Sequence, residues 1–208
     1  MSKFVPYATR KRLPLYYKLL KALLEKGVTD VTSTEIAKLV KIDSTTIRRD
    51  FSSIGKLGKK GTGYHVETML TIFEEEFELN KIEKVILVGL GQLGKAVASY
   101  FDGFDSVSMV TQIYDTDPTI IGTEYMNIEI LDYLNIENTL DKDATIAVLT
   151  VPGDSAQDIL DNLVSLGIKG FVNFSGKKVF CEKDNVLITD IDIAQVVQSL
   201  VYDLRSEY

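Results

Sequence analysis

The chain has 208 residues, of which 45% are hydrophobic and 25% charged, and its formal net charge is −7. This length suits one large domain or a small domain followed by a medium-sized one. The single cysteine, Cys181, excludes an internal disulfide and fits a reducing compartment. No apolar run approaches the roughly 20 residues that cross a bilayer, and the first residues lack a signal-peptide run, so we expect a cytoplasmic protein without a membrane partner.

The charge is divided unevenly along the chain. Up to Val66 there are fourteen Lys and Arg against five Asp and Glu, a balance of +9, whereas the remainder has nine against twenty-five, a balance of −16. A cationic segment attracts the phosphates of nucleic acid, while an anionic segment is repelled by them. The pattern favours nucleic-acid binding by the first third of the chain.

Three helices are predicted before residue 55. The first covers about residues 11–26, with Pro14 in its first turn, where the missing N–H has no helical partner. The second is announced by Thr32-Ser-Thr-Glu35, a capping-box pattern. The third begins near Asp43 or Ser44 and turns Ile47, Phe51 and Ile54 inward.

The second and third helices, joined by a tight turn, are typical of a helix-turn-helix, whose second helix enters the major groove of double-stranded DNA. Short hydroxyl side chains permit a close approach, and arginine bonds guanine or phosphate. The alternative is a three-helix packing module with solvated arginines. The residues that we expect at operator DNA on this helix are Ser44, Thr45, Thr46, Arg48, Arg49 and Ser52.

A glycine-rich segment, residues 55–66, follows and predicts a hairpin, the wing of a winged helix-turn-helix. Its candidate DNA-binding residues are Lys56, Lys59, Lys60 and Tyr64. His65 is the only histidine, so we expect no metal site. Residues 67–83 are expected to form a linking helix, which places a winged-helix domain with its linker at 1–80.

Residues 85–115 carry a dinucleotide fingerprint in its expected context. An apolar strand, Val85–Val88, leads into Gly89-Leu-Gly-Gln-Leu-Gly94 and then a helix. The glycines permit a tight turn, close approach of a pyrophosphate and packing of helix on strand. A second strand, 107–114, delivers Asp115, whose carboxylate suits a ribose 2′-OH and favours NAD over NADP. The predicted cofactor contacts of this part are Gly89, Leu90, Gly91, Gln92, Leu93, Gly94 and Asp115.

Further buried strands are predicted at 145–150 and 170–174, with a helix over 154–166 between them and a short strand near 128–131. Ligands lie beyond the carboxyl ends of strands in such sheets. We therefore expect a doubly wound, Rossmann-like α/β domain at 81–190. Its candidate nicotinamide-side residues are Thr150, Val151, Pro152, Asn173, Phe174 and Ser175.

The last helix, from Asp192 to about Arg205, is apolar along one side, and we assign 191–208 to dimerisation. Operator recognition by a helix-turn-helix generally uses two copies, which favours a homodimer.

The chain resembles the Rex family of bacterial redox-sensing repressors. The resemblance is carried by the string from Asp43 to Phe51, by Leu57–Gly61 with Gly63 and Tyr64, by Leu149–Pro152, and by Asn173-Phe174. It implies a homodimer of winged-helix and Rossmann domains with a swapped terminal helix, released from its operators by NADH. Matching positions for a redox switch are Tyr100, Asp192 and Lys18. Two departures fall on the nicotinamide side: Gly176 in place of a frequent proline, and Val196 or Val197 near a usual glutamate.

The resulting prediction is a repressor that senses the NADH/NAD⁺ ratio, with the dinucleotide as effector, and not an enzyme. An oxidoreductase is disfavoured because the cofactor half lacks a histidine, and the Tyr17/Lys21 pair lies in the DNA-binding part. The other alternative is a DNA-binding regulator with a different adenine-nucleotide or CoA ligand, or a degenerate pocket, since the second half also resembles CoA-binding domains.

Overall fold

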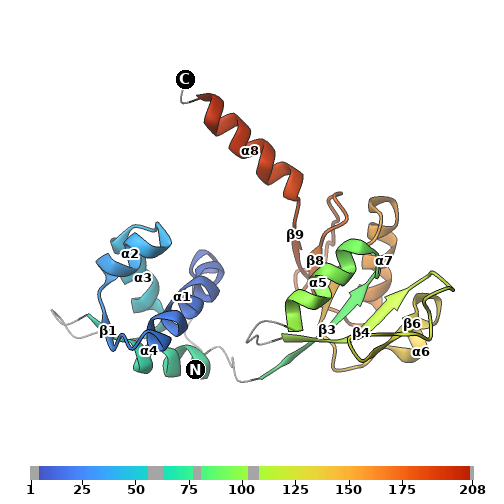
Figure 1. The fold of residues 1–208 in the computed structure, drawn as a ribbon, viewed down its shortest axis with the longest axis horizontal. Coiled ribbons are helices and arrows are strands. Elements are labelled where there is room, and N and C mark those ends of the chain that lie inside the picture. Colours follow the sequence, from blue (N-terminus) through green and yellow to red (C-terminus); the bar gives the residue numbers. More distant parts are fainter. Residues whose placement is uncertain (1–4, 56–62, 77–80, 103–107, 207–208) are drawn as a thin grey trace. The chain divides into compact units, whose positions relative to one another are not determined.

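The computed structural model describes residues 5–55, 63–76, 81–102 and 108–206. The chain divides into two compact units, Met1–Lys81 and Ile82–Tyr208, each shown in Figure 1.

The first unit is helical. It contains α1 (Tyr7–Glu25), α2 (Ser33–Val40), α3 (Ser44–Ile54) and α4 (Val66–Glu76), with two short antiparallel strands, β1 (Asp30–Val31) and β2 (Tyr64–His65). The predicted capping box is confirmed, since Thr32 and Glu35 satisfy each other's backbone N–H groups at the start of α2. The inward side of α3, formed by Ile47, Phe51 and Ile54, is also confirmed as buried.

Two boundary predictions in this unit were wrong. Because α1 begins at Tyr7, Pro14 lies inside the helix and not in its first turn. Burial of Leu13 and Tyr16 on either side of it supplies the packing that offsets one lost backbone hydrogen bond. The helix predicted over 67–83 is described as α4 over Val66–Glu76, Glu83 instead begins a strand, and the buried Met69 and Phe73 make α4 part of the first unit's core.

An acidic residue is buried in the same core. The carboxylate of Asp50 on α3 accepts hydrogen bonds from the Thr9 hydroxyl at 2.8 Å and from the Tyr16 hydroxyl at 2.7 Å. Arg12 donates two more, from Nε and Nη2, each at 2.7 Å. Burial by itself raises the pKa of Asp50, but the hydrogen bonds from Arg12, Tyr16 and Thr9 outweigh it and leave the pKa below its ordinary value.

The second unit is built on a seven-stranded sheet in the order β5-β6-β4-β3-β7-β8-β9. Its strands are β3 (Glu83–Val88), β4 (Ser108–Asp115), β5 (Glu124–Tyr125), β6 (Ile128–Asp132), β7 (Ile146–Leu149), β8 (Gly170–Asn173) and β9 (Leu187–Asp190). All neighbours pair in parallel except the β5–β6 pair. The short strand guessed near 128–131 is confirmed as β6, whereas β5 and β9 had no prediction.

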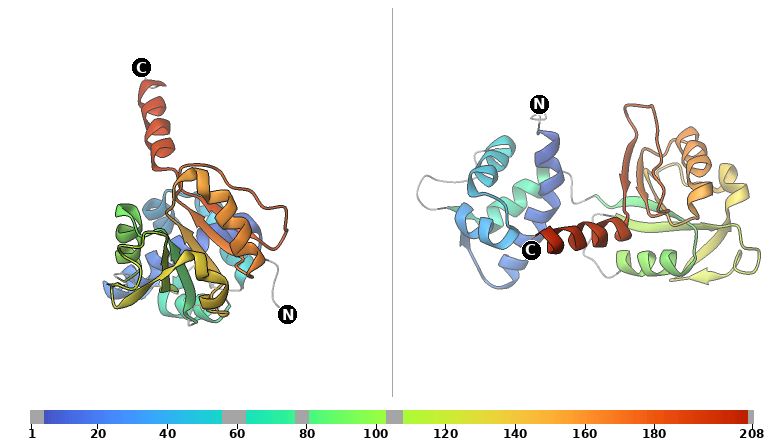
Figure 2. Two further views of the ribbon diagram at one scale, coloured as in Figure 1. Left: turned by 90° about the vertical axis from the view of Figure 1, so that its right-hand side faces the viewer. Right: turned by 90° about the horizontal axis from the view of Figure 1, so that it is seen from above.

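Helices cover both faces of this sheet, as Figure 2 shows. On one face Val85 and Leu87 pack with Ala98 of α5 (Gln92–Asp102). On the other, Ile86 and Val88 share a core with α6 (Ile136–Thr139) and α7 (Gly153–Ser165). The short 3-10 turn η1 (Tyr133–Asn135) directly precedes α6. The order of strands reverses beside β3, so the crevice expected for a ligand lies beyond the carboxyl ends of β3 and β7.

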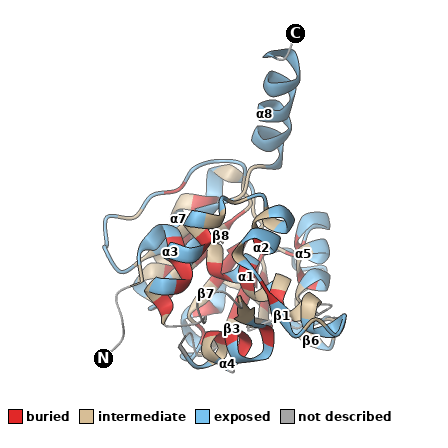
Figure 3. Ribbon diagram, turned by 90° about the vertical axis from the view of Figure 1, so that its left-hand side faces the viewer, coloured by how far each residue is buried: buried red, intermediate tan, exposed pale blue. Residues whose placement is uncertain are grey.

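The last helix, α8 (Ile193–Ser206), follows β9 and has no buried residue (Figure 3). Its apolar side chains are exposed, among them Val196, Val197, Leu200 and Leu204.

We predict that acid weakens the first unit through Asp50. Because its folded pKa lies below the unfolded value of about 3.9, the carboxylate contributes stability above that pH, and the contribution is lost as the pH falls through the folded value. The urea midpoint, followed by NMR signals from α1 and α3, should fall between about pH 5 and pH 2. Asp50→Asn should flatten this slope and lower stability by about 1–3 kcal/mol.

The control for this experiment is Asp30→Asn, which neutralises an exposed aspartate of the same unit. The hydrogen bond described for the Asp30 side chain comes from the hydroxyl of its neighbour Thr29. This variant should keep the wild-type slope. Equal slopes for Asp50→Asn and wild type would contradict the assignment.

Candidate DNA interface and cofactor site

The open face of α3 is where the sequence placed it. Thr45, Arg48, Arg49 and Ser52 are exposed, and Ser44 and Thr46 are half-buried. Asp43 caps the helix by accepting the N–H groups of Thr45 and Thr46, which holds its first turn. The Arg48 guanidinium donates to the Thr45 hydroxyl at 3.2 Å, so two of the predicted reading residues lie together one turn apart.

Tyr64 packs against the core of the first unit, a role that the sequence did not indicate. Its ring packs edge-to-face on Phe51, with the centroids 5.0 Å apart. Burial raises the pKa of the Tyr64 hydroxyl, and the charge of Arg48 opposes this shift. Of the predicted wing, Lys56, Lys59 and Lys60 lie outside the described residues. The strand that is described, β2, pairs with β1.

The glycine fingerprint forms a tight turn between β3 and α5. Gly89 has a φ of +93°, and a Cβ on it would lie 2.8 Å from the Thr150 carbonyl oxygen. A Cβ on Gly94 would lie 2.1 Å from the Gly89 carbonyl oxygen, whereas one on Gly91 would meet no atom within 4 Å. The first and third glycines are therefore required by packing, and the second leaves open space at the start of α5, where a pyrophosphate would fit.

Asp115 stands beside this turn, at the end of β4. Its Oδ2 accepts the Leu90 N–H at 2.6 Å, and its Oδ1 accepts the N–H groups of Thr116 and Asp117 at 2.7 and 2.9 Å. The carboxylate is thus held in place by backbone, half-buried and next to the glycine turn. Open space at Gly91 together with this fixed acceptor fits a dinucleotide with a free ribose diol.

Three of the predicted contact residues around the turn differ in exposure. Leu90 is only 3% exposed, so its side chain belongs to the core and its backbone N–H is the polar group that it contributes here. Gln92 and Leu93, at the start of α5, are exposed.

On the other side of the crevice, Thr150 follows β7. Its hydroxyl donates to the carbonyl oxygens of Gly89 at 2.5 Å and Val88 at 3.2 Å. This hydroxyl fixes the glycine turn, a role that the sequence did not indicate. Val151 lies against Gly89, and Pro152 is the residue that directly precedes α7.

Asn173 ends β8 and is buried, and its side-chain amide is fully used within the protein. Its Nδ2 donates to the Lys177 carbonyl and to Asp190, both at 2.7 Å, and its Oδ1 accepts the Ser175 N–H at 3.0 Å. These bonds hold a turn in which Gly176 has a φ of +75°. Proline cannot adopt that angle, so the turn accommodates the glycine at position 176 and would not accommodate a proline. Phe174 is half-buried against the core on the α5 face.

The three predicted switch residues are distributed over both units. Lys18 is on α1 of the first unit. Tyr100 is on α5 of the second unit and is 63% exposed. Asp192 caps α8 by accepting the Gln195 N–H at 3.0 Å. Their shared role stays a prediction.

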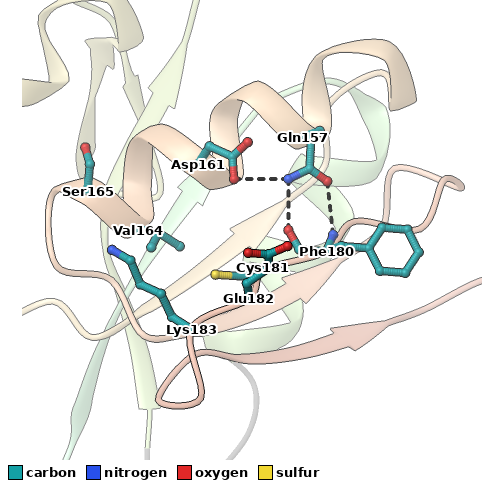
Figure 4. Close-up of a pocket in the computed structure, with 8 residues that line it drawn as sticks. All are labelled: Gln157, Asp161, Val164, Ser165, Phe180, Cys181, Glu182 and Lys183. Atoms are coloured by element: carbon teal, nitrogen blue, oxygen red, sulfur yellow. Dashed lines mark hydrogen bonds between the residues drawn. The ribbon is translucent and has the colours of Figure 1, made fainter.

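A separate cavity of about 530 Å³ lies between α7 and residues 180–183 (Figure 4). Gln157 closes one side by bonding both the N–H and the carbonyl of Phe180. None of the predicted cofactor residues lines this cavity.

Within the described parts of the chain, no helix could cross a membrane and no group of side chains could hold a metal ion.

Comparison with known proteins agrees with this geometry. Residues 4–52 match a model of a putative DNA-binding protein N-terminus, and residues 80–176 match a CoA binding domain. The chain is 43% identical to the redox-sensing transcriptional repressor Rex of Bacillus velezensis, over 97% of this chain and 93% of the relative. It is 42% identical to the Rex of Bacillus subtilis over the same shares.

The chain belongs to the Rex family. A solved structure of RSP with β-NAD⁺ and operator DNA matches with a TM-score of 0.89 and 29% identity, over 98% of this chain and 94% of that one. RSP with β-NADH matches with a TM-score of 0.84 and 27% identity, over 98% and 96%. RSP itself is described as a Rex-family repressor.

The comparisons confirm three sequence predictions. The chain is a Rex-family member, and its α/β fold joins an amino-terminal DNA-binding part to a Rossmann-like part. Its family consists of transcriptional repressors and not of enzymes. The swapped helix and the individual contact residues stay predictions.

The glycine turn supplies a paired test. Gly94→Ala should lower the free energy of unfolding by about 2–4 kcal/mol, because its Cβ meets a carbonyl oxygen. Gly91→Ala should change stability by less than about 1 kcal/mol and weaken NADH binding about tenfold or more, because its Cβ fills the open space. Chemical unfolding and NADH fluorescence titration measure the two effects. A Gly91→Ala protein with wild-type NADH affinity would place the pyrophosphate elsewhere.

Proposed function

We propose that this chain is a redox-sensing transcriptional repressor that binds operator DNA through α3 and leaves it when NADH binds the second unit. The observation that carries the proposal is the joining, in one Rex-family chain, of an exposed Ser/Thr/Arg helix face and a glycine turn with open space beside a fixed carboxylate. The solved structures of RSP with NAD⁺ and operator DNA, and with NADH, support it.

The dinucleotide acts here as an effector. Its binding shifts an equilibrium only if NADH prefers the DNA-incompetent form, since equal affinity for both forms would change nothing. Asp115 and the α5 amino terminus bind parts that NAD⁺ and NADH share, so discrimination belongs to the nicotinamide side, near Thr150 and the 173–177 turn.

A homodimer is part of the proposal. The exposed apolar side of α8 suits burial against a second copy, and two reading helices suit a two-fold operator. We assign DNA binding to 1–80, dinucleotide binding to 81–190 and dimerisation, with a swapped helix, to 191–208. Lys18, Tyr100 and Asp192 would then respond to the redox state, and the protein would act in the cytoplasm.

A CoA or other adenine-nucleotide ligand is the second candidate, because residues 80–176 match a CoA binding domain. Asp115 favours the dinucleotide: a carboxylate suits the unphosphorylated ribose diol of NAD, whereas the ribose of CoA carries a phosphate.

The experiment that tests the proposal is an operator gel shift at fixed NAD⁺, titrated in parallel with NADH, NADPH and acetyl-CoA. NADH should release the operator, and the other two should not at the same concentration. Release by acetyl-CoA alone would favour the second candidate, and saturation with NADH without release would contradict the sensor.

The substitution Asp115→Ala tests whether NADH binding and operator binding belong to different units. We expect it to weaken NADH binding about tenfold to a hundredfold, by loss of a charged acceptor for the ribose. Operator affinity without NADH should stay at the wild-type value, because the substitution lies outside the DNA-binding unit. Titration calorimetry and the gel shift measure the two quantities, and wild-type NADH affinity would show that the ribose is misplaced.

A further inference from the structure

Asp50 is unusual for a helix that faces DNA. It is the one acidic residue within α3, flanked by Arg49 and Phe51, and an exposed carboxylate at this place would repel phosphates. The residue is instead 3% exposed and faces α1, whereas Arg48 and Arg49 are exposed.

The donors to Asp50 are spread along α1. Thr9, Arg12 and Tyr16 follow one another at spacings of three and four residues, so they share one face over about two turns, or roughly 10 Å of helix. Together they give the carboxylate four hydrogen bonds of 2.7–2.8 Å. Tyr16 also packs edge-to-face on Phe51, with the centroids 5.2 Å apart.

This arrangement restrains more than a hydrophobic contact does. Apolar side chains tolerate small slides and rotations of one helix on another, but a fork-shaped guanidinium bonds a carboxylate in one plane and at one distance. A buried ion pair adds little stability over apolar residues of equal volume, and its best-attested use is to fix one arrangement among several.

We propose that Asp50, held by Thr9, Arg12 and Tyr16, is a positioning residue for operator reading: the cluster sets the angle and height of α3 on α1. The inference rests on the proposed function and deepens it. The guanidinium of Arg12 bonds Asp50 through Nε and Nη2, which ties this side chain to the placement of α3. A small rotation of α3 moves Thr45, Arg48 and Arg49 away from base edges while leaving a cationic surface for the backbone.

The test compares specific and non-specific binding. Dissociation constants are measured by fluorescence anisotropy for an operator duplex and a mixed-sequence duplex, at one salt concentration and at a temperature where circular dichroism shows each protein folded. For Asp50→Asn we expect operator binding weakened about tenfold or more, mixed-sequence binding changed less than about threefold, and NADH affinity unchanged.

Two further variants serve as controls. Arg48→Ala gives the reference for loss of a reading side chain. Asp30→Asn changes the charge equally and should keep the wild-type ratio of the two affinities.

Two milder variants keep the test decisive if Asp50→Asn does not fold. Arg12→Lys keeps the charge and loses the fork, and Tyr16→Phe keeps the ring and loses one donor; each should lower the affinity ratio several-fold. Folded variants that keep the wild-type ratio, or that lose both affinities equally, would overturn the positioning role. A wild-type protein that shows no preference for the operator would overturn the proposed function itself.

Discussion

The contact between Gly94 and the carbonyl oxygen of Gly89 is the constraint on which the cofactor half depends. It brings the start of α5 against the end of β3 so closely that no side chain fits between them. The same carbonyl accepts the Thr150 hydroxyl, and the Gly89 N–H donates to the Tyr114 carbonyl at 2.8 Å. The ends of β3, β4 and β7 are therefore held around one backbone turn. A site fixed in this way would bind the shared parts of NAD⁺ and NADH with little rearrangement, and we propose that the difference between the two is recognised near Thr150 and the 173–177 turn.

In the first unit, side-chain hydrogen bonds rather than a backbone contact hold two elements together. There α3, the proposed reading helix, is hydrogen-bonded to α1 through the buried Asp50 carboxylate. The cores of the two units, as far as the chain is described, share no residue. In the proposed homodimer, we therefore expect a ligand in the second unit to act on DNA binding by changing how intact units are arranged, and not by repacking the core beneath α3.

Much of this could be predicted from local sequence. The capping box, the inward side of α3, the glycine turn and the acid after the second strand all depend on residues within a few positions of one another or within one βαβ unit. Predictions failed where tertiary packing decided the outcome. Pro14 was misplaced because burial on both sides sustains a helix through it, and α4 was taken for a linker although Met69 and Phe73 belong to the core.

The hydrogen-bond partners that complete the sites come from distant segments. Asp50 and Arg12 are 38 positions apart, and Thr150 and Gly89 are 61 apart. Asn173 is paired with Asp190 of β9, a four-residue strand too short to show a pattern. The one available signal for the Asp50 cluster was the spacing of Thr9, Arg12 and Tyr16 on a single face of α1.

In the proposed sensor, NADH and operator DNA oppose each other through a shared equilibrium. Thermodynamic linkage requires the effect to be reciprocal. The most direct measurement is the NADH dissociation constant of the protein alone and of the protein saturated with operator duplex. We predict weaker NADH binding in the complex, by the same factor by which NADH weakens operator binding. An identical NADH affinity with and without operator would contradict it.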